Sequence, residues 1–319
     1  MAKYKIVIDT LGSDKGPEEV LKGAKLVLDE YPQVDVIIVG DEAQIKNSYL
    51  PMERVEIVHC PITVTNYDNA ANLLYDKNHK YAIFEAFRTA GERSDCIGMI
   101  TAGCSAALML GAIKYLLNEN RERPCLAAVL PTTQGGYTCL VDTGASVDCG
   151  PLQLQGFAHT GANFMKQLYK IENPRIGLLS VGSEPTKGNK LTKETFKLLE
   201  ADKELNFIGN IEGNSTFSGL CDVLVADGFA GNQVMKNAEG MAKNLITDIV
   251  KYAKKTGSQE AMQVVGYLMQ KYDFASLGAG IMLGVKRTVM KCRGSSDATA
   301  IKSAARILVA LAEHKDDIY

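Results

Sequence analysis

Short apolar, β-branched runs alternate along the chain with longer segments in which apolar residues recur every three or four positions. Residues 4–8 form the first run, and residues 17–29 form the first longer segment. Within that segment one face would carry Val20, Leu21, Ala24, Val27 and Leu28. This spacing predicts an amphipathic helix that follows a buried strand.

The same alternation continues to the end of the chain. We expect further strands over residues 34–39, 97–100, 125–130, 138–141, 176–179, 223–225 and 285–290, and helices over residues 81–89, 106–117, 154–168, 190–200, 232–252 and 298–312. Strands that are apolar almost throughout are typical of a sheet covered by helices on both faces. Alternation of strands with helices predicts parallel β-α-β units. The expected fold is therefore α/β, with a doubly wound and mostly parallel sheet.

No internal repeat, low-complexity stretch or Pro- or Ser-rich linker divides the sequence. A length of 319 residues allows one large domain or two smaller ones. We expect a single α/β domain over residues 1–319, with two lobes as the alternative. Residues 252–277 are polar and irregular, which predicts a peripheral helical excursion.

Composition excludes several classes of protein. Apolar residues make up 46% of the chain and charged residues 23%, which are ordinary globular values. A formal net charge of -2 argues against a general nucleic-acid or anionic-membrane binder. The N-terminus lacks the apolar core of a signal peptide, and no apolar run approaches the ~20 residues that span a bilayer.

The spacing of the cysteines and histidines argues against two further kinds of site. None of the 8 cysteines forms a C-x-x-C pair, and none of the 4 histidines forms an H-x-x-x-H pair. A zinc site and a disulfide framework are therefore not expected. We expect a cytoplasmic protein without a bound metal.

Several predicted strands end in turns rich in glycine and hydroxyl side chains. Such turns contain Asp9, Gly12 and Ser13; Gly103 and Ser105; and Asp227, Gly228 and Asn232. Ligands of open α/β sheets bind outside the carboxyl ends of the strands, where helix N-termini offer free N–H groups to an anion. Converging turns would make a phosphate or oxyanion site, although ordinary helix capping would explain any single one.

The most suggestive turn contains Gly294, Ser295, Ser296 and Asp297. It opens a predicted helix, and the cations Lys291 and Arg293 come just before it. Two cations, two hydroxyls and a helix N-terminus suit a tetrahedral anion. The alternative is that Ser296 or Asp297 only caps the helix while Arg293 is solvated.

A second loop offers a candidate cation after the strand expected at 176–179. It contains Lys187 and Asn189, where the lysine would meet a phosphate as a point charge. A solvated surface lysine is the alternative. Neither G-x-x-x-x-G-K-[ST] nor G-x-G-x-x-G occurs, so nucleotide binding has no support from a motif.

Taken together with the segments given below, these turns show that the chain resembles the acyl-carrier-protein-dependent phosphate acyltransferases of bacterial phospholipid synthesis, the PlsX family. The strongest stretch runs from Asn206-Phe207-Ile208-Gly209-Asn210 through Glu212-Gly213, Asp227-Gly228-Phe229 and Gly231-Asn232 to Glu239-Gly240. Further matches lie in residues 9–17, 142–149, 187–189 and 294–298. Together they cover essentially the whole chain in the family's order.

The resemblance implies both a fold and a reaction. The fold would be an α/β sandwich like that of isocitrate and isopropylmalate dehydrogenases, in a homodimer. Inorganic phosphate would attack an acyl thioester on acyl-carrier protein, giving an acyl phosphate and a free thiol. Such a transfer needs donors for its oxyanion but no metal or redox cofactor. Contact with membranes would be at most peripheral.

The chain departs from the family's pattern at the loops. The family's Asp-Ala-Met-Gly-Gly-Asp reads Asp9-Thr10-Leu11-Gly12-Ser13-Asp14 here, Cys104 replaces an amide, and Arg293 after Cys292 replaces a histidine. These changes resemble a related branch, the protein C catalytic subunit of glycine, sarcosine and betaine reductases. That branch holds an acetyl group as a cysteine thioester and releases it with phosphate as acetyl phosphate. Its partners would be components of the reductase complex.

Two cysteines are therefore candidates for an acyl relay. Cys104 and Cys292 lie on the loops expected to face the phosphate. A thiol at a helix N-terminus beside Arg293 is expected to have a lowered pKa. The alternative is that both are small buried hydrophobes, as free cysteines commonly are. A third interpretation is a non-catalytic partner subunit that has lost family residues.

Overall fold

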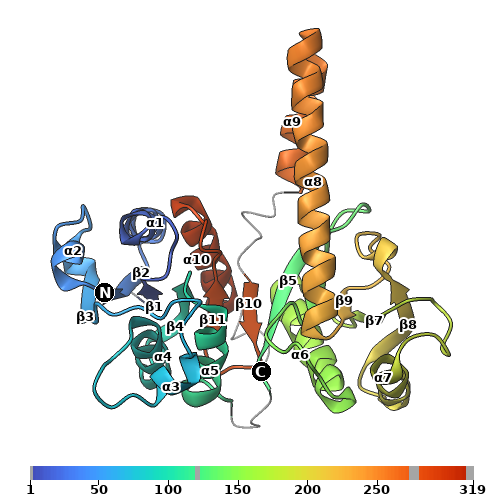
Figure 1. Cartoon of the computed structure of the whole chain (residues 1–319), viewed down its shortest axis with the longest axis horizontal. Coiled ribbons are helices and arrows are strands. Elements are labelled where there is room, and N and C mark those ends of the chain that lie inside the picture. Colours follow the sequence, from blue (N-terminus) through green and yellow to red (C-terminus); the bar gives the residue numbers. More distant parts are fainter. Residues whose placement is uncertain (1–2, 119–122, 273–279, 314–319) are drawn as a thin grey trace. The chain divides into compact units, whose positions relative to one another are not determined.

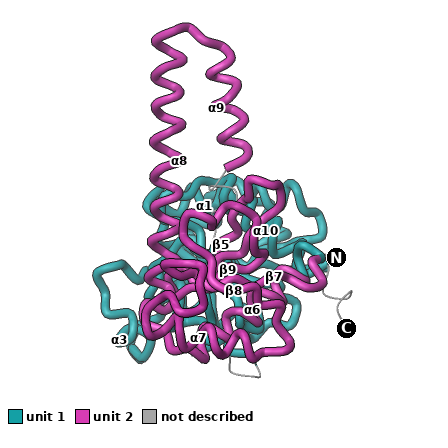
Figure 2. Tube along the Cα trace, turned by 90° about the vertical axis from the view of Figure 1, so that its right-hand side faces the viewer, with its two compact units in different colours: residues 1–126, 167–170, 279–319 teal, residues 127–166, 171–278 magenta. Residues whose placement is uncertain are grey.

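The computed structural model describes residues 3–118, 123–272 and 280–313. The chain divides into two compact units (Figure 2). Unit 1 comprises residues 1–126, 167–170 and 279–319, and unit 2 comprises residues 127–166 and 171–278. Each unit has its own strands, helices and core, so each positions its own candidate residues.

The strands of unit 1 follow the order β3-β2-β1-β4-β11-β10. They are β1 (Tyr4–Asp9), β2 (Val34–Gly40), β3 (Val55–His59), β4 (Cys96–Thr101), β10 (Gly280–Leu283) and β11 (Thr288–Lys291). All neighbours pair in parallel except β10 with β11. Because β1, β2 and β4 are buried almost throughout, both faces of this sheet are covered, as their apolar runs predicted.

Helices cover the sheet of unit 1 on both sides. Figure 1 shows α1 (Pro17–Glu30) beside α10 (Ala298–Glu313) on one face, and α4 (Ala82–Glu92) with α5 (Ser105–Tyr115) on the other. The short helices α2 (Glu42–Lys46) and α3 (Ala70–Leu74) flank them. Helix α1 begins with Pro17 and has two glutamates in its first turn, as helix N-termini favour. These layers confirm the predicted α/β class.

The strands of unit 2 follow the order β5-β6-β9-β7-β8. They are β5 (Cys125–Pro131), whose first two residues belong to unit 1, β6 (Tyr137–Val141), β7 (Arg175–Ser180), β8 (Asn206–Glu212) and β9 (Val223–Val225). Only β5 and β6 pair antiparallel. Helices α6 (Pro151–Tyr169) and α7 (Lys190–Ala201) complete the layers, around a core that includes Leu130, Leu140, Cys221 and Leu224.

Two helices extend beyond the rest of unit 2. They are α8 (Gly228–Thr256) and α9 (Gln259–Lys271), which run side by side (Figures 1 and 2). Of the excursion expected at 252–277, residues 252–272 include the end of α8 and all of α9, and residues 273–277 lie outside the described residues. Among the residues that the structure describes, no helix is both long and apolar enough to cross a bilayer.

The prediction of a strand over residues 285–290 is wrong in its first half. A hairpin of β10 and β11 lies there instead, and Gly284 leaves β10 with a φ of 75°. The turn lies over residues 284–287, and Lys286 and Arg287 interrupt the apolar residues at 285 and 289–290. The pattern also missed β3 and β8, which are less completely buried, and the short helices α2 and α3.

Candidate functional site

Three loops of unit 1 meet at the carboxyl ends of β1, β4 and β11. The Asp14 N–H donates a hydrogen bond to the Gly294 carbonyl at 2.8 Å, and the Ser13 hydroxyl donates to the same oxygen at 3.2 Å. The Cys292 N–H donates to the Thr101 carbonyl at 2.8 Å. Because α1, α5 and α10 begin at these loops, their N-termini and the predicted residues gather at one edge of the sheet.

Gly12 and Gly103 bring the loop after β1 and the loop after β4 into close contact. A Cβ atom added to Gly12 would lie 2.6 Å from the Gly103 Cα, and Gly12 has a φ of 85°. Both facts require a residue without a side chain at position 12. The pairing holds the loop after β1 against the loop after β4.

We expect Gly12→Ala to lower stability and impair the site together. The added methyl must separate the two loops, in addition to the ~1–2 kcal/mol that the left-handed backbone costs an L-residue. Gly257→Ala is the control, since Gly257 has a φ of 68° with nothing within 4 Å of an added Cβ and lies away from these loops, between α8 and α9. Thermal unfolding and acyl-transfer rates should show the greater loss for Gly12→Ala. Equal losses in both variants would contradict this account of the contact.

Asp9 connects the loop after β1 to the end of β4 through hydrogen bonds. Its carboxylate is 1% exposed and accepts hydrogen bonds from the Thr101 hydroxyl at 2.7 Å and the Leu11 N–H at 3.1 Å. Thr101 in turn accepts from the Gly103 N–H at 2.9 Å. Burial raises the pKa of Asp9 to about 6, against the opposing effect of these donors and of Lys291. A buried acceptor of this kind suits the positioning of loops better than direct contact with an anion.

Lys291 is one of the two cations that the sequence places just before the turn at residues 294–297, and the structure brings it into the site. Its Nζ donates to the Cys292 carbonyl at 2.6 Å and to the Ala102 carbonyl at 3.4 Å, so it bridges two loops. Burial lowers its pKa, while the negative charges of Asp14 and Asp9 act in the opposite direction. Its place at the end of a strand, directly before the anion loop, was the signal that the sequence offered.

The expectation of a lowered pKa is wrong for Cys292. This thiol is 1% exposed, and burial raises its pKa to about 12. The side chain belongs to the core of unit 1, so proximity to Arg293 in sequence does not make it a thiolate. Cys104 differs, because it is half-buried and occupies the N-cap position of α5.

The turn before α10 is capped by its own side chains. The Ser296 hydroxyl accepts from the Arg293 N–H at 3.0 Å, and the Asp297 carboxylate accepts from the Ala300 N–H at 3.0 Å. The Asp14 carboxylate lies against Gly294, since a Cβ added there would lie 2.5 Å from Asp14 Oδ2. A tetrahedral anion bound at this turn would take the place of the Asp14 carboxylate. Asp14 is exposed, so its side chain can rotate into solvent.

In unit 2, two predicted residues line a cavity of about 270 Å³ at the ends of β7 and β9. Asn189 caps α7 by accepting from the Thr192 N–H at 2.9 Å, and Asp227 caps α8 by accepting from the Ala230 N–H at 2.7 Å. The cavity is otherwise mainly apolar, and the buried Ser180 hydroxyl has no hydrogen-bond partner in the described part of the chain. Lys187 is exposed on the loop before Asn189.

Gly228 and Asn232 attach the start of α8 to the loop after β6. The Gly228 N–H donates to the Ser146 carbonyl at 2.8 Å, and the Asn232 amide donates to the Thr143 carbonyl at 3.0 Å. A Cβ on Gly228 would lie 2.5 Å from the Ser146 oxygen. Through these contacts, both residues hold the start of α8 against the loop after β6.

Comparisons with known proteins agree with this arrangement. Residues 4–315 match the family described as "Fatty acid synthesis protein". The chain is 38% identical over 319 residues to the phosphate acyltransferase of Halothermothrix orenii, covering 95% of this chain and 93% of that protein.

Solved structures extend the likeness to the fold. A phosphotransacetylase from Streptococcus pyogenes superposes with a TM-score of 0.64 at 15% identity, covering 98% of this chain and 94% of that one. A 4-hydroxythreonine-4-phosphate dehydrogenase from Klebsiella pneumoniae superposes with a TM-score of 0.55 at 13% identity, covering 97% of this chain and 99% of that one. These likenesses confirm the predicted dehydrogenase-like sandwich.

Proposed function

The chain belongs to the fatty acid synthesis protein family, and on that premise we propose that it forms an acyl phosphate from an acyl thioester and inorganic phosphate. It is thus an acyltransferase. The observation that supports this reaction best is the meeting of three helix N-termini and the partly buried Lys291 at one edge of unit 1. The positive ends of helix dipoles and a fixed cation are what a phosphate dianion and a developing oxyanion require.

The proposed chemistry is a direct displacement. A phosphate oxygen attacks the carbonyl carbon of the thioester, and the carbonyl oxygen becomes an oxyanion. The C–S bond then breaks, the thiolate leaves and takes a proton, and the acyl group remains bonded to phosphate. The chain's part is to hold the phosphate, stabilise the oxyanion and keep the loops in register.

We propose acyl-carrier protein as the acyl donor and a homodimer as the assembly. The exposed apolar side chains of α8 and α9 offer a surface for a second copy, and they include Met241, Leu245, Met262 and Tyr267. All 8 cysteines are free, which fits a cytoplasmic protein in a reducing compartment. Sedimentation velocity at micromolar concentration tests the dimer.

The activity is tested by incubating the isolated chain with acyl-carrier protein, charged with acyl groups of several lengths, and inorganic phosphate. Hydroxylamine traps acyl phosphate as a hydroxamate that mass spectrometry identifies. We expect turnover that depends on phosphate. If a folded chain forms no acyl phosphate from any donor, that result would contradict the proposal and support the non-catalytic partner subunit instead.

We expect Cys104→Ser to keep acyl-phosphate formation within about threefold of the parent rate, because direct attack needs no thiol relay. Nothing in the comparisons favours the reductase branch, and Cys292 is too deeply buried to serve as a nucleophile. Intact-protein mass spectrometry after incubation with acetyl phosphate checks this independently. An acetyl adduct on Cys104 that phosphate removes, with activity abolished in Cys104→Ser, would establish the relay.

A further inference from the structure

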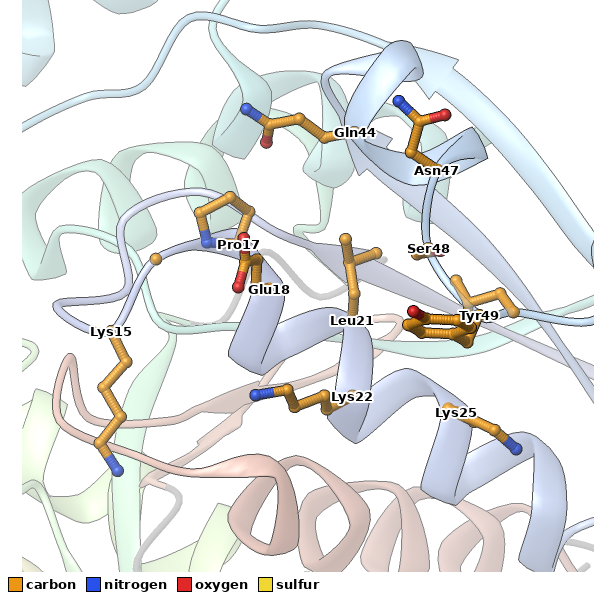
Figure 3. A pocket seen from close by; sticks show the side chains of 12 residues that line it. Lys15, Pro17, Glu18, Leu21, Lys22, Lys25, Gln44, Asn47, Ser48 and Tyr49 are labelled. Carbon is orange, nitrogen blue, oxygen red and sulfur yellow. The ribbon is translucent and has the colours of Figure 1, made fainter.

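A cavity of about 690 Å³ lies in unit 1 between α1 and residues 44–50 (Figure 3). Its volume falls within the ~300–1,000 Å³ of small-molecule sites. The loop that carries Gly12 and Ser13 also lines the cavity, through Lys15 and Gly16. A ligand in the cavity therefore has one end beside the candidate anion site.

The lining combines an apolar floor with amides and an aromatic ring. Leu21 and Leu50 are 5% and 7% exposed and form apolar surface, whereas Tyr49 is 92% exposed. Figure 3 shows the Tyr49 ring next to Leu21. The side-chain amides of Gln44 and Asn47 have no hydrogen-bond partner among the described residues, so they are available to a ligand.

Cations border the same cavity. Lys15, Lys22 and Lys25 line it together with a single acidic residue, Glu18. Two of the lysines pair on the surface of α1, Lys22 with Glu19 at 3.3 Å and Lys25 with Asp29 at 2.8 Å. Exposed pairs of this kind contribute little, so an anionic ligand can compete for both ammonium groups.

We propose that this cavity binds the phosphorylated pantetheine arm of the acyl donor. The arm carries a phosphate at one end, amides and an apolar branched segment along its length, and the thioester at the other end. Those groups match in turn the lysines, the amides of Gln44 and Asn47, and the surface of Leu21, Leu50 and Tyr49. The thioester end would then reach the loop of Gly12 and Ser13. The inference rests on the proposed function, because it supplies that reaction's donor.

The first test is direct binding, which needs no turnover. Calorimetry with 4′-phosphopantetheine as the probe should show binding to the parent chain, and unphosphorylated pantetheine should bind less well. We expect the double variant Lys22→Gln, Lys25→Gln to weaken binding of the phosphorylated probe by about tenfold, and Tyr49→Ala to weaken both probes. Tyr49 is 92% exposed, so its replacement leaves the fold intact.

The matched control is Lys197→Gln, Lys203→Gln, which removes two exposed lysines of unit 2. It should bind both probes as the parent does. The proposal would be overturned if the parent and the double variant bound the phosphorylated probe equally, or if the parent did not bind it at all. Probe binding by a chain that makes no acyl phosphate would instead contradict the proposed function alone.

The second test identifies the source of the arm. Initial rates are measured with acyl-phosphopantetheine, acyl-coenzyme A and acyl-carrier protein, and the donor with the lowest KM for the parent chain is the source. The double variant should raise KM about tenfold for every donor that the parent uses, with kcat and the KM for phosphate unchanged. A rise confined to acyl-carrier protein, with probe binding intact, would make the lysines a protein-docking surface and overturn the arm site.

Discussion

Replacing Lys291 with methionine is expected to lower kcat/KM for acyl-phosphate formation by about 100- to 1,000-fold, the usual effect of removing one oxyanion donor. Methionine keeps much of the side-chain length but removes the charge. Lys291 is held by the carbonyls of Cys292 and Ala102, which places its ammonium group between the two loops that face the phosphate. Mobile cations from solvent cannot replace this fixed positive charge, because the site is partly shielded from water.

Folding and catalysis can be separated in this variant. The two carbonyls lose a donor, which costs about 1 kcal/mol each and lowers the melting temperature modestly. Lys286→Met is the control, because Lys286 is exposed in the same unit before the start of β11, at the opposite end of the strand from Lys291. We expect the control to keep its activity. A folded Lys291→Met chain with activity within threefold of the parent would remove Lys291 from the site.

Asp9→Asn is expected to raise stability at pH 8 while lowering activity at least tenfold. The folded pKa of about 6 lies above the ordinary 3.8, so the folded state binds the Asp9 proton more tightly than the unfolded state does. The stability that this group contributes is fully present below pH 3.8 and is lost as pH rises through about 6. Two pKa units correspond to about 3 kcal/mol, which the neutral asparagine recovers above that pH.

The activity should change in the opposite direction. The carboxylate accepts from both Thr101 and Leu11, whereas an asparagine amide has one acceptor oxygen and would make Thr101 turn its hydroxyl. A shift of about 1 Å in a loop that positions substrate costs roughly 100-fold. We therefore expect the parent's kcat/KM to gain a component that rises with pH through about 6, which the variant lacks.

Urea unfolding of both chains between pH 4 and pH 8 measures the stability difference. The difference should favour Asp9→Asn increasingly as pH rises, and a difference independent of pH would show that Asp9 titrates normally. Phosphate also titrates near neutrality, but identically for both chains, so the ratio of their rates isolates Asp9. A constant ratio would contradict a positioning role for its carboxylate.

The fold was largely predictable because its signal is local. The apolar runs of β1, β2, β4, β7 and β9 and the periodic faces of α1, α4, α7 and α10 all occur where the pattern placed them. The elements it missed depend on less local features. Strand β8 is only partly buried, and the β10–β11 hairpin depends on a turn at Gly284 inside an apolar stretch. The sequence allowed two lobes only as an alternative to one domain, because no linker marks a boundary between the two compact units.

The sequence by itself determined the α/β class, the family and the loops that gather at the carboxyl ends of the strands, because periodicity, turn residues and ordered motifs are properties of neighbouring residues. Only the tertiary structure decided what those loops contain. It buried Cys292, paired Asp9 with Thr101 from 92 positions away and placed Lys291 across two loops. Desolvation and hydrogen bonding set the charge of such groups, and both depend on residues that meet only when the chain folds.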